Sequence, residues 1–136
     1  MHTVYLSLGA NIGNRRATLL RAVEMLGERA GMLEELSSFR ETAPWGFKSP
    51  NMFINAAVCL RTRMPPLELL HVTQEIEREL GRTSKTMGEM YGDRPIDIDI
   101  LLYDDIRIDS PELVIPHPLM LERDFVMTPL HEILHG

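Results

Sequence analysis

Two aspartates separated by one residue give the clearest indication of chemistry in this sequence. Asp97 and Asp99 lie within RPIDIDI, residues 94–100, where isoleucines occupy the alternate positions. A β-strand directs alternate side chains to opposite faces, so both carboxylates share one face while the isoleucines enter the core. Mg²⁺ takes one or two protein carboxylates and leaves its other positions to water and substrate phosphates. The pattern therefore favours a polyphosphate bound through Mg²⁺, with two acids on a solvated strand face as the alternative.

Positively charged residues precede these acids. The polar segment before the acidic strand, residues 81–93, contains Gly88 and Gly92, which give it freedom to move. Cations that close over a phosphate chain can stabilise the charge that develops during phosphoryl transfer. A solvated connector is an equally good interpretation of this segment taken alone. The cations within or beside it are Arg78, Arg82, Lys85 and Arg94.

Other charged residues near the acids are ambiguous. His117 and Arg123 lie in PHPLMLERDF, downstream of the acidic strand, and could return to it. A single histidine is nevertheless more often structural. Glu77 lies near the end of a helical pattern, where an acid more often pairs with a cation in solvent than binds a ligand.

A second group of residues is polar and aromatic. Asn55 interrupts an apolar strand pattern, and a buried amide without partners costs free energy, so this residue should have a specific bonding role. Aromatic faces and an amide together suit a flat heteroaromatic ligand, because the amide can match the donors and acceptors of the ring edge. Ordinary core packing explains each aromatic residue equally well. The group consists of Thr42, Trp45, Phe53, Asn55 and Phe125.

These residues need a framework, and hydrophobic periodicity predicts one. The pattern indicates the order β, α, β, β, α, β, and we expect an α+β sandwich of ferredoxin-like type. In such a fold an antiparallel sheet carries both helices on one face and leaves the other face free for a ligand. The expected strands are 4–8, 32–40, 53–60 and 96–103, and the expected helices are 19–27 and 65–81.

Composition restricts the class of protein. The chain has 136 residues, which fits a single domain spanning residues 1–136. Its net charge of −6 argues against a nucleic-acid binder. Cys59 is the only cysteine and lies in an apolar run, so we expect a buried strand residue rather than a disulfide or metal ligand. No leader or membrane segment is recognisable, and we expect a cytoplasmic protein.

Common nucleotide motifs are missing. The segment Gly9–Gly13, GANIG, follows a strand but lacks the Lys-Ser/Thr pair of a P-loop and the third glycine of a dinucleotide-binding loop. No cluster of nucleophile and base typical of hydrolases can be recognised from the spacing. A nucleotide would therefore be held in another way.

Six blocks in order resemble a known family over nearly the whole chain. The blocks are LGANIGNR, ETAPWG, FINAAV, IERELGR, YGDRPIDIDILLY and IPHPLMLERDFVMTPL. Together they resemble the 6-hydroxymethyl-7,8-dihydropterin pyrophosphokinases of folate biosynthesis, also called 2-amino-4-hydroxy-6-hydroxymethyldihydropteridine diphosphokinases. The resemblance implies a ferredoxin-like fold, ATP as the diphosphoryl donor, two Mg²⁺ ions, the pterin hydroxymethyl group as acceptor and AMP as product.

The resemblance also implies roles for individual residues. It makes Asp97 and Asp99 the metal ligands, and it directs Arg82 and Arg94 to the phosphates. Residues implied at the nucleotide are Glu77, Ile100, His117 and Arg123, with Lys85 as a further candidate. Residues implied in the pterin pocket are Thr42, Ala43, Trp45, Phe53, Asn55 and Phe125, the last as a stacking partner.

The sequence departs from the family pattern at three places. Ser84 stands where a second loop arginine is frequent, so Lys85 could replace that cation. Asp93 stands where proline is usual before the arginine, which could alter how Arg94 is presented. Many members continue beyond the final HEILHG, so stability or the covering of one sheet edge could differ.

The expected reaction is in-line attack of the pterin hydroxymethyl oxygen on the β-phosphorus of ATP, promoted by alignment and charge stabilisation. No general base is identified, and His117 is better explained as a contact to ATP. A monomer is expected. A metal-dependent nuclease using the same acids and a noncatalytic ligand-binding module are the competing interpretations. The acidic net charge and the aromatic pocket argue against the first, and the density of phosphate and metal ligands argues against the second.

Overall fold

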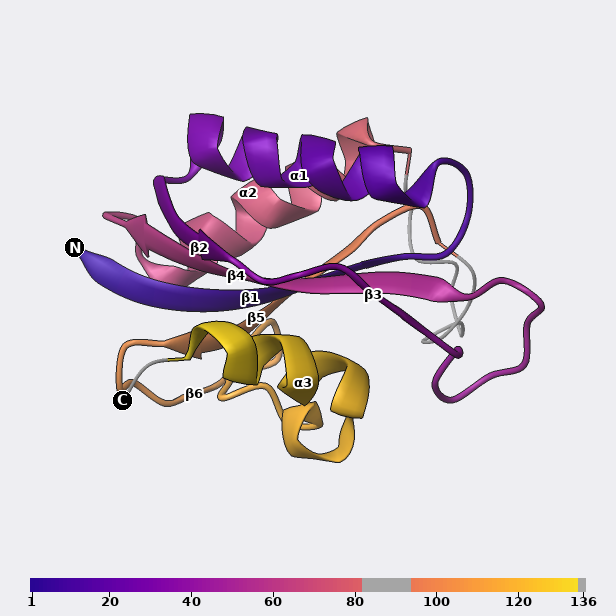
Figure 1. Cartoon of the computed structure of the whole chain (residues 1–136). Coiled ribbons are helices and arrows are strands. Elements are labelled where there is room, and N and C mark those ends of the chain that lie inside the picture. The colour runs from indigo at the N-terminus through magenta and orange to yellow at the C-terminus, as the bar shows by residue number, and fades with distance from the viewer. Residues whose placement is uncertain (82–93, 135–136) are drawn as a thin grey trace.

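The computed structural model describes residues 1–81 and 94–134. Two helices lie on one face of an antiparallel sheet, and a third helix lies on the opposite face (Figure 1). In chain order the elements are β1 (His2–Ala10), α1 (Arg15–Arg29), β2 (Met32–Leu36), β3 (Arg40–Thr42), β4 (Phe53–Thr62), α2 (Pro66–Glu79), β5 (Asp97–Tyr103), β6 (Ile108–Asp109), β7 (Val114–Ile115), a 3₁₀-helix (Met120–Glu122) and α3 (Asp124–Ile133).

The main sheet has the order β2-β4-β1-β5, and β3 pairs with the other half of β4. The predicted βαββαβ core and the ferredoxin-like α+β class are therefore confirmed. The stretch 32–40, predicted as one strand, is divided into β2 and β3. Ser37 causes the interruption, because its hydroxyl oxygen accepts the N–H of Ala57 at 2.8 Å in place of a backbone carbonyl.

Local sequence explains where the two core helices begin. The side chain of Asn14 caps α1 by accepting the N–H of Ala17 at 3.2 Å. Pro66 opens α2, at a position where the missing N–H costs no hydrogen bond. Both helices pack on the sheet over a core that includes Leu6, Leu26 and Ile98.

The opposite face of the sheet is only partly free, which corrects the expectation of an open ligand face. Helix α3 covers one part of it with a second apolar cluster that contains Cys59, Leu101 and Leu130. Cys59 is buried, as predicted. The part left uncovered by α3 is where β1, β4 and β5 carry small and polar side chains. Within residues 1–81 and 94–134, no helix is long and apolar enough to cross a membrane.

Candidate active site

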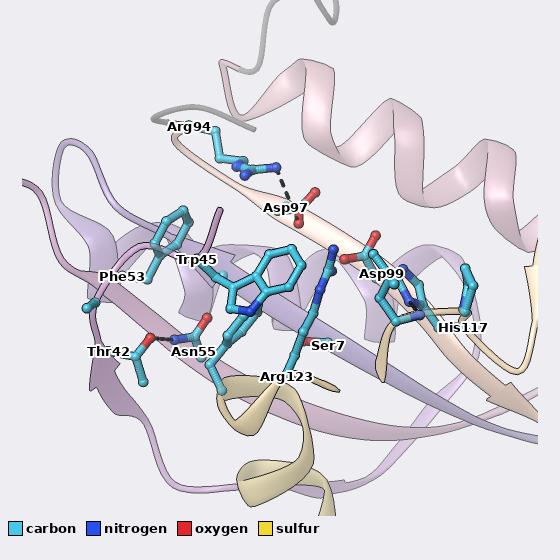
Figure 2. A pocket seen from close by; sticks show the side chains of 15 residues that line it. Ser7, Thr42, Trp45, Phe53, Asn55, Arg94, Asp97, Asp99, His117 and Arg123 are labelled. Atoms are coloured by element: carbon cyan, nitrogen blue, oxygen red, sulfur yellow. Dashed lines mark hydrogen bonds and ion pairs between the residues drawn. The ribbon is translucent and has the colours of Figure 1, made fainter. Parts of the chain in front are cut away.

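Strand β5 brings the two aspartates to the uncovered part of the sheet face. Asp97 and Asp99 are half-buried, while the alternate Ile98 and Ile100 enter the core, as the sequence predicts. In the pairing with β1, Asp97 lies opposite Gly9 and Asp99 lies opposite Ser7. Figure 2 shows both carboxylates projecting from β5 on the same side.

The electrostatics at this pair suit a cation. Burial and then the negative charge of Asp97 raise the pKa of Asp99 well above its ordinary value, because two carboxylates held together resist ionisation. A bound cation would relieve that repulsion. In the described part of the chain, no group of three or more His, Cys, Asp or Glu side chains is arranged to hold a metal. A pair of carboxylates fits Mg²⁺, which completes its shell with water and substrate phosphates.

Arg94 lies beside this pair. Its guanidinium is 3.7 Å from the carboxylate of Asp97 and 5.6 Å from the centre of the Phe53 ring. The side chain is 14% exposed. A positive charge is therefore held between Asp97 and the Phe53 ring, where it could bind an anionic group.

A cavity of about 230 Å³ opens on the uncovered sheet face. All six residues that the resemblance implies for a pterin pocket line it, and so do Arg94, both aspartates and His117 (Figure 2). The floor comes from β1, β4 and β5, and one side comes from the segment that follows β3. The lining residues are Ser7, Gly9, Thr42, Ala43, Trp45, Phe53, Asn55, Arg94, Asp97, Asp99, His117, Pro118, Leu119, Arg123 and Phe125.

Asn55 is held in a defined orientation within this cavity. It is 2% exposed, and its Nδ2 donates a hydrogen bond to Thr42 Oγ1 at 2.5 Å. On β1, the cross-strand partner of Asn55 is Gly9. A Cβ atom at Gly9 would lie 2.9 Å from Asn55 Oδ1, which is closer than side chains tolerate. The amide therefore depends on the missing side chain of Gly9 for its position.

Two aromatic rings and Arg123 lie together in the lining of the first cavity. The Arg123 guanidinium lies 4.5 Å from the centre of the Trp45 ring and 5.8 Å from that of Phe125. Such cation–π contacts are favourable when they are shielded from water, and Arg123 is 8% exposed. The resemblance implies Arg123 at the nucleotide. Here it lines the first cavity beside the aromatic residues, and its charge also acts on Asp99 and His117.

A second cavity, of about 240 Å³, adjoins the first. It shares Asp97, Asp99, His117 and Pro118 with the first cavity. The residues that complete its lining are Leu70, Gln74, Glu77, Ile98, Ile100, Pro111, Glu112, Leu113 and Val114. Three of the residues implied at the nucleotide, Glu77, Ile100 and His117, are therefore gathered here.

Besides Asp97, Asp99 and Glu112, two more ionisable residues, Glu77 and His117, line this second cavity. Glu77 is buried, and its Oε2 accepts the backbone N–H of Ile98 at 2.8 Å, which ties α2 to the strand that carries the aspartates. Burial lowers the pKa of His117, and the charge of Arg123 acts in the same direction, while Asp97 opposes it. The imidazole is consequently neutral at pH 7 and can accept or donate a hydrogen bond.

Arg82 and Lys85, with the departures at Ser84 and Asp93, lie outside the described residues. Conversely, sequence reasoning missed Ser7, Gly9, Pro118 and Leu119 as lining residues. The first two could have been found only from the register of β1 against β4 and β5, because their chemistry is unremarkable until Asn55 and Asp97 are placed beside them.

Comparisons with known proteins agree with this arrangement. Residues 5–135 match the 7,8-dihydro-6-hydroxymethylpterin-pyrophosphokinase family. A Porphyromonas gingivalis protein named 2-amino-4-hydroxy-6-hydroxymethyldihydropteridine pyrophosphokinase is 56% identical over 134 residues, covering 98% of this chain and 91% of that protein. The Bacillus subtilis protein of the same name is 44% identical over 130 residues, covering 95% of this chain and 76% of that protein.

Solved structures share the fold at lower identity. A crystal structure of HPPK-DHPS in complex with substrates has a TM-score of 0.75 and 15% identity, covering 97% of this chain and 40% of that one. Wild-type Plasmodium falciparum HPPK-DHPS has a TM-score of 0.71 and 16% identity, covering 96% of this chain and 41% of that one. The chain thus spans about two fifths of the length of these structures, and the likeness concerns the fold.

The fold and the site define an α+β protein in which two adjoining cavities share a pair of carboxylates. The chain belongs to the 7,8-dihydro-6-hydroxymethylpterin-pyrophosphokinase family. It is accordingly a diphosphokinase of folate biosynthesis, with ATP as one substrate and the hydroxymethyl pterin as the other. This assignment excludes the nuclease and the noncatalytic module that the sequence alone left open.

Proposed function

We propose that the two cavities hold the two substrates on either side of Asp97 and Asp99. The first cavity takes 6-hydroxymethyl-7,8-dihydropterin, and the second takes ATP. The observation that carries this proposal is the shared boundary, since both cavities are lined by the two aspartates and by His117. A transfer between two bound molecules requires that their reacting ends meet, and this boundary is where they would meet.

The pterin pocket has hydrogen-bonding groups for the edge of a flat ring and aromatic surface for its faces. Asn55, oriented by Thr42, offers its amide to the ring edge, and Ala43 lines the same side of the cavity. Phe53, Trp45 and Phe125 supply aromatic surface. Buried amides and aromatic rings together give orientation and affinity in small-molecule sites.

Charged residues at the boundary would bind the triphosphate. Arg94 faces the phosphates from the side of the first cavity, and Arg82 and Lys85 join it from the segment before β5. Glu77, Ile100 and His117 contact the nucleotide in the second cavity, and Arg123 reaches it from beside the aromatic residues. Arginine suits this role because its planar guanidinium can bind two phosphate oxygens at once.

Asp97 and Asp99 would hold two Mg²⁺ ions together with the phosphates of ATP. Bound there, the metal would supply charge neutralisation for the phosphate oxygens in the transition state. The aspartates fit this role because their repulsion in the ligand-free protein, seen as the raised pKa of Asp99, favours a cation between them.

The reaction is an in-line displacement at the β-phosphorus. The hydroxymethyl oxygen forms a bond to that phosphorus as the bond to the oxygen bridging the α- and β-phosphates breaks, and AMP leaves with that oxygen. The hydroxyl proton passes to solvent or to a phosphate oxygen, because no residue is assigned as its base. Alignment of the substrates and the fixed charge of Arg94 are the contributions of the chain.

The remaining properties are proposed on the same basis. We expect the chain to act as a single domain over residues 1–136, as a monomer in the cytoplasm, without nucleic acid or membrane as a partner. Size-exclusion chromatography with light scattering would measure the molecular mass, and a dimer mass would contradict the monomer.

The deciding experiment measures AMP release from ATP. Release should require both Mg²⁺ and the hydroxymethyl dihydropterin. Asp97→Asn and Asp99→Asn should each lower turnover at least a hundredfold while keeping a folded far-UV circular dichroism spectrum, because the core face of β5 is apolar. Asp109→Asn, on the exposed side of β6, is the matched control and should retain activity. Full activity of the double variant at 97 and 99 would exclude the proposed metal site.

A further inference from the structure

We infer that Asn11 is a positioning residue that fixes Arg94 between the two substrates. This inference rests on the proposed contact of Arg94 with the phosphates. Asn11 directly follows β1, within the GANIG segment that matches neither a P-loop nor a dinucleotide-binding loop. Despite lying in a loop, its side chain is 3% exposed. A buried amide needs hydrogen-bond partners, and the partners identify its role.

Asn11 holds both sides of the Arg94 backbone. Its side-chain Oδ1 accepts the N–H of Arg94 at 2.7 Å, and its own backbone N–H donates to the carbonyl of Arg94 at 3.1 Å. The ladder between β1 and β5 has already ended at Gly9 and Asp97. The side chain of Asn11 therefore replaces a backbone acceptor and extends the link between the two strands to Arg94.

The other end of the amide reaches a third segment. Asn11 Nδ2 donates to the carbonyl of Asn51 at 3.4 Å, at the end of the connection between β3 and β4 that also carries Trp45. One partner requires an acceptor and the other requires a donor, and the amide of Asn11 carries both groups on one side chain. The same side chain thus links the aromatic side of the pterin pocket to the residue that faces the phosphates.

Fixing the backbone of Arg94 has a consequence for its side chain. From this anchored position the guanidinium lies between Asp97 and the Phe53 ring. An arginine side chain has many rotamers. When its backbone is already fixed, less conformational entropy has to be lost as the guanidinium is ordered in the transition state. Small displacements of a catalytic group can cost large factors in rate. Asn11 lines neither of the two cavities, so it acts on the reaction only by fixing the position of Arg94.

A double-mutant cycle tests the inference. Asn11→Ala should lower turnover about tenfold at saturating substrates, which corresponds to about 1.4 kcal/mol, and should change the KM for ATP less than threefold. In an Arg94→Ala background the same substitution should lower turnover less than twofold, because the residue it positions is gone. Single-turnover measurements with enzyme in excess keep the slow variants measurable.

Asn14→Ala is the matched control. It removes the cap of α1 from the same loop and so lowers stability without touching Arg94, and its turnover should stay within twofold of wild type. Thermal melting establishes that each variant is folded at the assay temperature. Asn11→Ser, which keeps a shorter hydroxyl, enters the cycle if Asn11→Ala melts below that temperature.

The outcomes separate this inference from the proposed function. Equal losses from Asn11→Ala in both backgrounds would overturn the positioning role while leaving Arg94 as a phosphate contact. Wild-type turnover in Arg94→Ala would overturn that contact and the inference together. Loss of turnover in Asn14→Ala equal to that in Asn11→Ala would reduce Asn11 to a stabilising residue.

Discussion

A row of three cross-strand neighbours joins the two halves of the site. Asn55 on β4, Gly9 on β1 and Asp97 on β5 are paired side by side across the sheet. The amide that would recognise the pterin and the carboxylate that would hold the metal are thus separated by a residue without a side chain. In the proposed complex the reacting hydroxymethyl group lies between them, over Gly9, which adds no side chain there.

Gly9→Ala should weaken pterin binding selectively. The added Cβ would lie 2.9 Å from Asn55 Oδ1 and 3.5 Å from the Phe53 ring, so the amide must move away from its bond with Thr42. Misplacing one buried hydrogen-bonding group costs roughly 1–3 kcal/mol, which is about tenfold or more in affinity. Calorimetry with an ATP analogue and Mg²⁺ first, then the pterin, should detect the loss only in the second titration.

Two further variants sharpen this measurement. Asn55→Ala should reproduce the loss for the pterin, and the double variant should add little to it, because both changes remove the same contact. Gly27→Ala, in α1 and outside both cavities, adds a methyl group against Leu33 and should leave both titrations unchanged. Equal losses for both ligands in Gly9→Ala would indicate a damaged fold instead.

For single residues, the sequence predicted which side chains are functional better than which residues lie beside them in the fold. The alternation around Asp97 and Asp99 was sufficient to place both on one face, and Asn55 was recognisable as a polar residue in an apolar strand. Gly9 and Asn11 were not recognisable, because their roles depend on which strands become neighbours. Strand pairing is a long-range property, and no local pattern in a single sequence encodes it.

Among the elements, α3 sets the boundary of the pterin pocket. It begins at Asp124, next to Arg123 and Phe125, and it is attached at its far end through Glu132. That carboxylate accepts the N–H of Ser38 at 2.9 Å and its hydroxyl at 2.8 Å, and pairs with Arg40 at 3.2 Å. The helix is thereby tied to the connection between β2 and β3.

Glu132→Gln should lower the melting temperature at pH 7. Hydrogen bonds from Ser38, and the Arg40 charge, hold the pKa of Glu132 below its ordinary value of 4.5. A carboxylate with a lowered pKa contributes stability above its unfolded-state pKa, and that contribution is lost as the pH falls through the folded-state value. The difference in melting temperature between wild type and variant should therefore shrink below about pH 4.5.

A matched control separates this attachment from general charge effects. Glu75→Gln removes an exposed carboxylate from α2 and should change the melting temperature little at any pH. A difference between wild type and Glu132→Gln that stays constant from pH 7 to pH 3 would contradict the ionic attachment of α3.

Periodicity predicted helices α1 and α2 but not α3. Val126, Leu130 and Ile133 have helical spacing and pack in the second apolar cluster. Pro129 lies inside the helix, however, and a proline in this position normally indicates a helix end. The strands of the core were easier to predict because their apolar runs are bounded by glycine, proline or polar segments.

In the whole molecule, the arrangement proposed to serve catalysis works against stability. The sheet is well packed on the side of α1 and α2, and its other side holds two like charges that are half-buried close together. Burial and the charge of Asp97 raise the pKa of Asp99, so its ionised form is less favourable in the folded protein than in the unfolded chain. Functional sites commonly carry such a cost.

Asp99→Asn should therefore stabilise the ligand-free protein while abolishing turnover. A neutral amide of nearly the same shape removes the repulsion with Asp97, so the melting temperature at pH 7 in EDTA should rise by a few degrees. Adding Mg²⁺ with an ATP analogue should reverse the order, because a ligand that binds only the folded state raises stability more when it binds more tightly. Wild type should then melt above the variant.

Asp109→Asn, exposed on β6, should follow wild type under both conditions. If Asp99→Asn melted below wild type in EDTA, the carboxylate of Asp99 would stabilise the ligand-free fold, which would contradict its role as a destabilising cation ligand.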